Sequence, residues 1–184
     1  MAAGKGTRMK STRPKVLHRL GGRALLAHVI TCAARLSSRQ AVVITGHGAI
    51  EVEAACGGFT PAEGSFGLKF ARQEPQLGTG HAVQQALPLL ADDGVTLVLS
   101  GDVPLTQPDT LAALLAACGG ERLALLTLEL PDPTGYGRIE RAADGNVRAI
   151  VEHKDATDAQ RSIREIYSGI MAVPTRLLRG WLAR

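Results

Sequence analysis

Apolar positions recur along the chain with two spacings, one typical of helices and one typical of strands. Helical spacing from residue 24 to 36 predicts a first helix, whose apolar side is formed by Leu25, Leu26, Val29, Ile30 and Ala33. Short runs of β-branched and aliphatic residues at 41–45 and 95–99 predict strands, because each run is too short for a buried helix. Residues 80–90, between these runs, carry a helical pattern.

The alternation continues in the second half of the chain. Pro108 opens an alanine- and leucine-rich segment that predicts a helix ending at Cys118, and residues 123–130 predict a further strand. Alternating strands and helices without an internal repeat are typical of an α/β domain, in which crossover helices cover a sheet. Ligands of such sheets bind beyond the carboxyl ends of the strands, so the residues that follow each strand are the first candidates for a site.

Composition narrows the class of protein. The chain has 184 residues, of which 45% are hydrophobic and 3% aromatic, which suits one globular domain but not a nucleic-acid binder that relies on stacking. The net charge of +4, carried by scattered basic residues, suits an anionic small molecule. Cys32, Cys56 and Cys118 lack metal-ligand spacing, and the sequence shows neither a signal peptide nor a membrane-length apolar run. We therefore expect a cytoplasmic protein that binds neither nucleic acid nor membrane.

A glycine-rich segment near the start is a candidate phosphate-binding loop. It reads Gly4-Lys5-Gly6-Thr7-Arg8-Met9 and is followed by Pro14-Lys15-Val16-Leu17. Glycines let backbone N–H groups turn toward an anion, while Arg8 and Lys15 supply two cations. The segment lacks the third glycine of a dinucleotide-binding loop and the Gly-Lys-Ser/Thr of a P-loop, so the phosphates would be held in another way. The alternative is an ordinary basic surface loop.

A carboxylate follows the strand predicted at 95–99. In Ser100-Gly101-Asp102-Val103-Pro104-Leu105, Gly101 would allow a ligand to approach closely and Asp102 is placed to hold Mg²⁺. Mg²⁺ binds at about 2.1 Å to one or two protein carboxylates plus phosphate oxygens, which is what a nucleoside triphosphate site needs. The alternative is that Asp102 caps the turn before Pro104.

A second glycine-rich turn precedes the helix predicted at 80–90. It reads Gln73-Glu74-Pro75-Gln76-Leu77-Gly78-Thr79-Gly80-His81-Ala82. The primary amide of Gln73 or Gln76 offers a donor and an acceptor together, which matches the imide edge of uracil. The alternative is that both glutamines are ordinary polar loop residues, and we interpret His81 as a structural partner rather than a base. Because no nucleophile is paired with a base, we expect no covalent intermediate.

Six segments occur in an order that is highly specific. They are Ala2-Ala3-Gly4-Lys5-Gly6-Thr7-Arg8-Met9, Pro14-Lys15-Val16-Leu17-His18, Gln76-Leu77-Gly78-Thr79-Gly80-His81-Ala82, Gly101-Asp102-Val103-Pro104-Leu105, Asp132-Pro133-Thr134-Gly135-Tyr136-Gly137-Arg138-Ile139 and Ile150-Val151-Glu152-His153-Lys154-Asp155-Ala156. Together they resemble the uridyltransferase domain of the bacterial N-acetylglucosamine-1-phosphate uridyltransferases, through nearly the whole chain. The resemblance implies a Rossmann-like nucleotidyltransferase domain with a mostly parallel sheet flanked by helices. Residues 1–184 would then be a partial uridyltransferase domain, truncated at both ends.

The activity that the resemblance implies is transfer of the uridylyl group of UTP to N-acetylglucosamine 1-phosphate. The products would be pyrophosphate and UDP-N-acetylglucosamine, a precursor of peptidoglycan and lipopolysaccharide. Arg8, Lys15 and Mg²⁺ on Asp102 would align the two anions and neutralise charge as it builds. Carried over by motif, the substrate-binding residues would be Met1, Ala2, Ala3, Gly4, Lys15, Gln73, Gly78, Thr79, Ser100, Gly101 and Asp102 for the nucleotide, with Gly137, Glu152 and Tyr167 near the sugar.

The chain departs from the family in three places. Only Met1-Ala2-Ala3 precede Gly4, where the family has a short apolar strand, so a central strand would be missing from the sheet. A second metal ligand and the left-handed β-helix acetyltransferase domain, through which the family forms homotrimers, would lie beyond Arg184. Tyr167 stands where the family usually has an asparagine that contacts the ligand.

The missing strand leads to an expectation about stability. Natural domains are stable by only about 5–15 kcal/mol, so an unpaired gap in a sheet could remove most of that margin. The alternatives to uridylyl transfer are another nucleotidyltransferase, such as a molybdenum-cofactor guanylyltransferase or a sugar-phosphate thymidylyltransferase, and a non-catalytic nucleotide-binding module.

Overall fold

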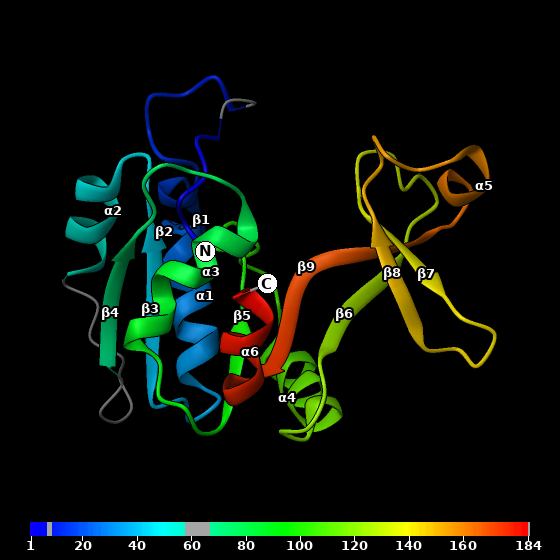
Figure 1. Cartoon of the computed structure of the whole chain (residues 1–184). Coiled ribbons are helices and arrows are strands. Elements are labelled where there is room, and N and C mark those ends of the chain that lie inside the picture. The colour runs from blue at the N-terminus through cyan, green and yellow to red at the C-terminus, as the bar shows by residue number, and fades with distance from the viewer. Residues whose placement is uncertain (7–8, 58–66, 184) are drawn as a thin grey trace.

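The computed structural model describes residues 1–6, 9–57 and 67–183, and these form a body and an arm (Figure 1). The arm, residues 132–164, projects from the body, which holds both termini. Two long strands, β6 (Ala124–Glu129) and β9 (Glu165–Pro174), run between body and arm and join them.

The helices of the body are short and alternate with strands. They are η2 (Lys15–Leu17), α1 (Leu25–Ala34), α2 (Ala49–Cys56), α3 (Thr79–Ala86), η3 (Leu87–Leu89), α4 (Pro108–Cys118) and α6 (Thr175–Leu182). The helices predicted at 24–36, 80–90 and 108–118 are confirmed as α1, α3 with η3, and α4. No helix in the described part of the chain has the length and apolarity needed to cross a bilayer.

One part of the sheet is a parallel pair of strands. β3 (Gln40–Thr45) and β4 (Gly67–Arg72) pair along their whole length. A small antiparallel ribbon, β1 (Arg19–Leu20) with β2 (Arg23–Ala24), precedes α1. The strand predicted at 41–45 is therefore confirmed as β3.

The other part of the sheet is antiparallel and is organised by β9. Both β5 (Val95–Val98) and β6 pair antiparallel with β9. In the arm, β7 (Arg138–Arg141) pairs with β9 and with β8 (Val147–Val151), and α5 (Asp158–Arg161) packs nearby. The predicted α/β fold is confirmed. The described strands form a parallel β3–β4 pair and a separate antiparallel sheet, rather than one mostly parallel sheet, because β9 runs opposite to its neighbours.

The first residues of the chain lie between β3 and β5, at the carboxyl ends of these strands. Ala2 N–H donates to the carbonyl of Ile44 at 2.8 Å, and the amino group of Met1 donates to the carbonyl of Leu99 at 2.7 Å. The rest of the space between β3 and β5 is a cavity of about 700 Å³. Among the described strands, β3 and β5 do not pair with one another. The expected low stability stays a prediction.

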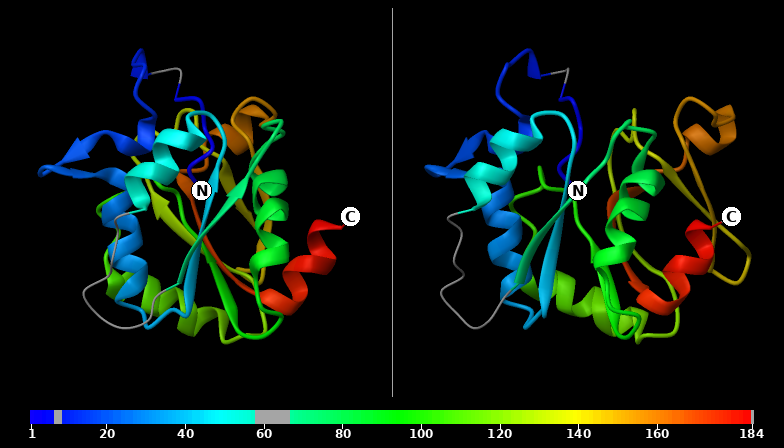
Figure 2. Two further views of the ribbon diagram at one scale, coloured as in Figure 1. Left: turned by 90° about the vertical axis from the view of Figure 1, so that its left-hand side faces the viewer. Right: turned by 60° about the vertical axis from the view of Figure 1, so that its left-hand side comes forward.

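Helices cover both faces of the body's sheet (Figure 2). The views place α1 and α4 on one face and α3 and α6 on the other. On the first face Leu26 and Ile30 of α1 pack with Val43. On the second, Val83 of α3 and Leu178 of α6 pack with Val173 of β9. Burial of this apolar surface is the main force that holds the layers together.

Candidate active site

The glycine-rich loop begins where the chain leaves the carboxyl ends of β3 and β5. Ala2 and Ala3 are buried beside these strands, and Gly4 is exposed. Gly6 has φ of +58°, and a Cβ at this position would lie 3.0 Å from the Cβ of Lys15. The loop therefore folds back onto the start of η2 in a conformation that favours glycine. The structure brings Gly6 and Lys15 together, whereas Arg8 lies outside the described residues.

Lys15 and Asp102 form an ion pair in front of this loop. Lys15 Nζ lies 2.5 Å from Asp102 Oδ2, and the side chains are 43% and 29% exposed. Asp102 is positioned by the turn after β5, in which Val103 N–H donates to the carbonyl of Ser100. Among the described residues, the partner found for the Asp102 carboxylate is the Lys15 ammonium and not an amide of the turn. The pair places a cation beside a carboxylate. These are the two kinds of group that a metal-assisted phosphate site needs, one for the phosphates and one for the metal.

The backbone around Gly101 is packed against the start of the chain. Gly101 N–H donates to the carbonyl of Met1 at 2.9 Å, and a Cβ at Gly101 would lie 2.9 Å from that same oxygen. The Cβ would also lie 3.2 Å from side-chain atoms of Val16 and Leu26. Burial lowers the pKa of the Met1 amino group from 8.0 to about 6, although the Asp102 charge opposes this shift. Met1, Gly101 and Asp102 thus form one closely packed unit.

Gln73 lies at the carboxyl end of β4, on the other side of β3. Its side chain is buried, and its amide nitrogen lies 2.8 Å from the carbonyl oxygen of Gly78 and 3.2 Å from His81 Nδ1. His81 Nε2 lies 3.1 Å from the amide nitrogen of Gln85. The interpretation of His81 as a structural partner is therefore confirmed. Gly78 (φ +105°) and Thr79 are exposed at the start of α3, so the turn is open to a ligand.

Gly137 and Glu152 of the arm come together with Tyr167 at the start of β9. A Cβ at Gly137 would lie 3.6 Å from Glu152 Oε1, and the carbonyl of Gly137 accepts a bond from Tyr167 N–H at 2.9 Å. Glu152 is exposed. Tyr167 is largely buried, which raises the pKa of its phenol to about 12. The phenolic oxygen is buried and has no hydrogen-bond partner among the described residues.

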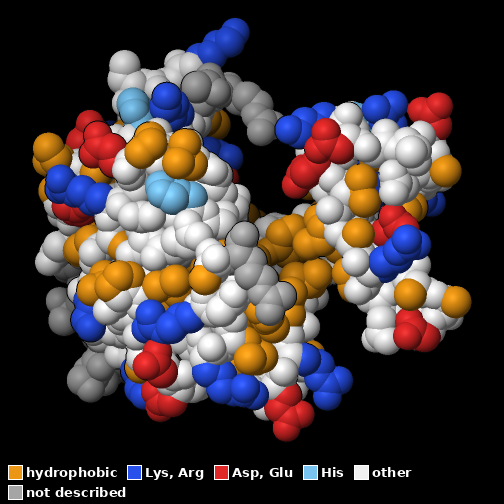
Figure 3. All heavy atoms as spheres, in the orientation of Figure 1, with side chains coloured by type: hydrophobic (Ala, Val, Ile, Leu, Met, Phe, Trp, Pro, Cys, Tyr) orange, Lys and Arg blue, Asp and Glu red, His pale blue; other side chains and the backbone are white. Residues whose placement is uncertain are grey.

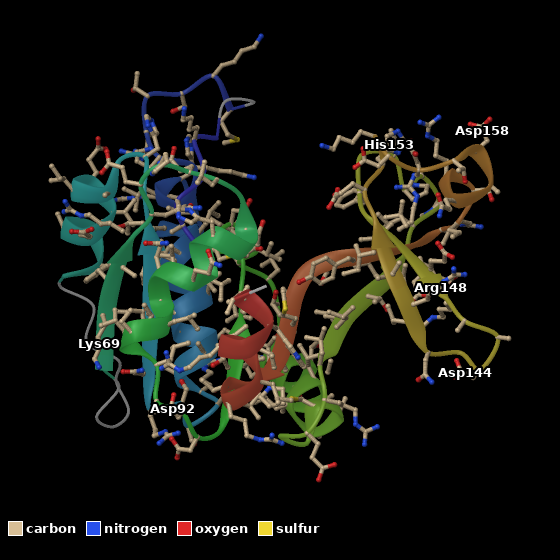
Figure 4. The ribbon with its side chains drawn as sticks, in the orientation of Figure 1. Lys69, Asp92, Asp144, Arg148, His153 and Asp158 are labelled. Carbon is tan, nitrogen blue, oxygen red and sulfur yellow. The ribbon has the colours of Figure 1, made fainter. Side chains whose placement is uncertain are left out.

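Arg138 holds this part of the arm in shape. The residue is 1% exposed, and its guanidinium donates to the carbonyl of Tyr136 and lies 3.1 Å from His153 Nδ1. His153 and Asp158 lie at the same end of the arm, whereas Asp144 lies at the other end (Figure 4). A buried cation is costly unless it is hydrogen-bonded, so these contacts fix the segment that carries Gly137. The sequence analysis assigned Arg138 no role, because its charge gives no sign of burial.

Gly169 lies where β9, coming from the arm, contacts the turn after β5. It has φ of +85°, and a Cβ at this position would lie 3.3 Å from Ser100 Oγ. Since β9 passes from the arm to the body, Tyr167 and Gly169 lie on a strand that reaches the turn of Ser100 and Asp102. Gly169 was not among the predicted site residues, and the local signal for it is a glycine inside a mainly apolar run at 166–174.

A deep notch separates the arm from the body (Figure 3). Apolar side chains form its floor, where β6 and β9 run from the body to the arm. Charged side chains of both signs lie on its rims. The phosphate-binding candidates are residues of the body, and two of the sugar-binding candidates, Gly137 and Glu152, are residues of the arm. No cluster of three or more His, Cys, Asp or Glu residues that could hold a metal occurs within residues 1–6, 9–57 and 67–183. A single carboxylate with phosphate oxygens still suits Mg²⁺, which keeps much of its water.

Comparisons with known proteins identify the family. The family model described as MobA-like NTP transferase domain matches residues 1–165. Bifunctional protein GlmU of a Polaromonas species is 77% identical over 195 residues, which cover all of this chain and 41% of the relative. Bifunctional protein GlmU of Acidovorax ebreus is 70% identical over 184 residues, again all of this chain and 39% of the relative. The chain thus spans about two fifths of the length of these curated relatives.

Solved structures show the same fold at low identity. UDP-glucose pyrophosphorylase from Acinetobacter baumannii superposes with a TM-score of 0.73 at 18% identity, covering 97% of this chain and 74% of the other. A putative glucose-1-phosphate thymidylyltransferase from Bacillus anthracis gives 0.76 at 15% identity, covering 97% and 71%. These likenesses confirm the α/β architecture.

Proposed function

Because the chain belongs to the family of MobA-like NTP transferase domains, we propose that it transfers the uridylyl group of UTP to N-acetylglucosamine 1-phosphate. The products are UDP-N-acetylglucosamine, for the cell-wall and lipopolysaccharide precursors, and pyrophosphate. The single observation that carries the proposal is 77% identity, across the whole chain, to a protein named bifunctional protein GlmU. The geometry adds support, since Lys15 and Asp102 lie together in the body and Gly137 and Glu152 lie together in the arm.

The nucleotide side of the site positions and neutralises phosphates. Lys15 and the backbone of the Met1–Gly4 segment face the triphosphate, and Arg8 supplies a second cation. Asp102 would hold Mg²⁺, which would supply neutralisation of charge on the reacting phosphates. Lys15 and Asp102 are paired with one another, and each would gain a new partner when nucleotide and metal bind. Gln73, fixed by Gly78 and His81, stands beside the turn that receives the base.

The arm side orients the attacking sugar phosphate. The exposed carboxylate of Glu152 accepts hydrogen bonds from sugar hydroxyls, and the backbone of Gly137 lies close enough to contact the ring. Tyr167 supports this part of the site, because its backbone N–H donates to the carbonyl of Gly137. Holding both anions in line supplies most of the rate, because proximity and electrostatic stabilisation dominate phosphoryl-type transfers.

The test is pyrophosphate release by the 184-residue chain with Mg²⁺ and N-acetylglucosamine 1-phosphate. UTP is compared with CTP, GTP, dTTP and ATP, and glucose 1-phosphate serves as the matched sugar control. We expect release with UTP and the N-acetylated sugar to exceed every other pair. Preference for GTP or dTTP would move the assignment to a guanylyltransferase or a thymidylyltransferase. Tight UTP binding without pyrophosphate release would favour a binding module.

A further inference from the structure

One side chain of α2 joins the carboxyl ends of β3 and β4. The carboxylate of Glu53 accepts from the hydroxyl of Thr45, the last residue of β3, at 2.9 Å. The same carboxylate accepts from Nε and Nη2 of Arg72, the last residue of β4, at 3.0 and 2.9 Å. Glu53 therefore bonds to the ends of both strands at once. We call Thr45, Glu53 and Arg72 the Glu53 clamp.

The Glu53 clamp differs from an isolated surface ion pair. Thr45 is 0% exposed, so its hydroxyl needs an acceptor inside the fold, and Glu53 supplies that acceptor. The two parallel bonds from Arg72 fix the plane of the carboxylate. Hydrogen bonds from Arg72 and Thr45 hold the pKa of the Glu53 carboxyl below its usual value. Since Arg72 is 58% exposed, its pair with Glu53 adds little to stability, and its main effect is on geometry.

The clamp adjoins both candidate base-reading glutamines. Gln73 follows Arg72 in the chain, and its N–H donates to the carbonyl of Thr45 at 2.8 Å. Gly46 follows Thr45, and a Cβ at Gly46 would lie 2.8 Å from Nε2 of Gln76. A change in the spacing of the two strand ends would therefore move both glutamines relative to one another.

The amide of Gln73 has a fixed orientation, which makes its position important for the choice of base. Its Nε2 lies 2.8 Å from the carbonyl oxygen of Gly78, and because that oxygen can only accept, the amide nitrogen donates to it. The amide oxygen of Gln73 is left as an acceptor. Uracil presents an N–H at N3 whereas cytosine presents a lone pair there, so this acceptor favours uracil. Hydrogen bonds weaken steeply with misalignment, so discrimination depends on where the amide is held.

We propose that Glu53 is a positioning residue for base recognition, which holds the ends of β3 and β4 so that Gln73 and Gln76 accept uracil and reject cytosine. The inference rests on the proposed function, since it takes UTP as the nucleotide. The partners found for Glu53 among the described residues are Thr45 and Arg72, and neither is a catalytic candidate. Loss of Glu53 should therefore change the choice of base and leave the use of the sugar phosphate unchanged.

The experiment compares kcat/KM for UTP and for CTP in pyrophosphate release by the full 184-residue chain with Mg²⁺ and N-acetylglucosamine 1-phosphate. In Glu53→Ala we expect the ratio of UTP to CTP to fall about tenfold, through a higher KM for UTP, while the KM for the sugar phosphate stays the same. Glu53→Gln keeps an acceptor for Thr45 and should restore the ratio to within about threefold of the wild-type value.

Asp93→Ala is the matched control. It breaks another two-bond pair, in which Nη1 and Nη2 of Arg39 each lie 3.1 Å from an oxygen of Asp93. Arg39 precedes β3, so this pair lies at the end of the strand opposite to the clamp. We expect the ratio of UTP to CTP to stay at the wild-type value. An equal fall in Asp93→Ala and Glu53→Ala would show a general loss of order in the sheet and overturn the inference.

Arg72→Met tests the clamp should Glu53→Ala fail to fold. It changes an exposed side chain and leaves Thr45 its acceptor, so the protein should fold, and the ratio of UTP to CTP should fall about threefold. An unchanged ratio in Arg72→Met, or in folded Glu53→Ala, would overturn the proposal.

Equilibrium binding separates this inference from the proposed function. Calorimetry with UTP and with CTP, each with Mg²⁺ and without sugar phosphate, gives the ratio of the two Kd values without turnover. A chain that prefers UTP but releases no pyrophosphate would refute the proposed function, and Glu53→Ala should still reduce its preference about tenfold. A Kd ratio that Glu53→Ala leaves unchanged would refute the positioning role alone. A wild-type chain that does not distinguish the two nucleotides would overturn both.

Discussion

The two sides of the notch are built in different ways. On the body side, the positions of Gly6 and Gly101 are set by backbone packed against backbone or against a neighbouring Cβ, with spaces too small for a side chain. On the arm side, one buried arginine, Arg138, bonds to Tyr136 and His153, the neighbours of Gly137 and Glu152 in the chain. Substitutions in the body should therefore affect the chemistry common to every substrate pair, whereas substitutions in the arm should affect the sugar.

The largest expected effect tests the body side. Asp102→Asn keeps the size of the side chain but removes the charge that faces Lys15 and would hold the metal. We expect kcat to fall by about 10²–10³-fold, similar to the loss of one preorganised electrostatic group in other enzymes. Steady-state pyrophosphate release measures it, with both sugar phosphates. A variant that loses activity with only one of the two sugars would contradict the division between body and arm.

The next effect tests the arm. Arg138→Met keeps most of the volume but leaves the carbonyl of Tyr136 and His153 Nδ1 without their donor. We expect a loss of about 3 kcal/mol in the free energy of unfolding, measured by urea denaturation. Arg148→Met is the matched control, because that arginine is 72% exposed and pairs with Glu140 on the surface. Its cost should stay below about 1 kcal/mol, and equal losses in the two variants would refute the role given to Arg138.

The pH dependence of the free energy of unfolding should also distinguish the body from the arm. The pKa of the Met1 amino group is 8.0 in the unfolded chain. Burial in the body lowers this pKa to about 6 in the folded protein. Between these values the unfolded state binds more protons, so stability rises from pH 6 to pH 8 and falls as the pH returns to 6. The gain is at most about 2–3 kcal/mol. Urea denaturation at both pH values, repeated with Arg138→Met, should give the same slope, since the arm does not contact Met1.

The smallest effect concerns the sugar alone. Glu152→Gln removes the charge but not the acceptor, so the KM for N-acetylglucosamine 1-phosphate should rise about tenfold, equivalent to about 1.4 kcal/mol, while the KM for UTP stays the same. Asp144→Asn, at the other end of the arm, is the control and should change neither. A rise in the KM for UTP alone would show that Glu152 contacts the nucleotide rather than the sugar phosphate, and would contradict the prediction.

Sequence patterns predicted the regular part of the body well. The helix at 108–118 and the strands at 41–45, 95–99 and 123–130 correspond to α4, β3, β5 and β6 within one residue at most ends. Their signals are local, since they arise from apolar spacing and from Pro108 at the first turn of its helix.

The arm and its connection to the body were less predictable. β9 contains Ser168 and Gly169, which interrupt its apolar pattern, and its partners on β5 and β6 lie between 36 (Glu129 with Glu165) and 79 (Val95 with Pro174) positions earlier in the chain. The burial of Arg138 depends on carbonyl groups that only the folded arm brings together. The motif Asp132–Ile139 indicated that this segment matters, but the contact of Gly169 with Ser100 arises from the path of β9 and has no local signal.

Label transfer tests the central claim most directly. The chain is incubated with Mg²⁺, N-acetylglucosamine 1-phosphate and UTP labelled at the α-phosphorus, and the labelled product is identified by mass. We predict that label enters UDP-N-acetylglucosamine, that omission of the sugar phosphate abolishes this product, and that Asp102→Asn removes nearly all of it. If the folded chain instead transferred label from another nucleotide to the sugar, or none although UTP is bound, the assignment of the notch as a uridylyl-transfer site would be contradicted.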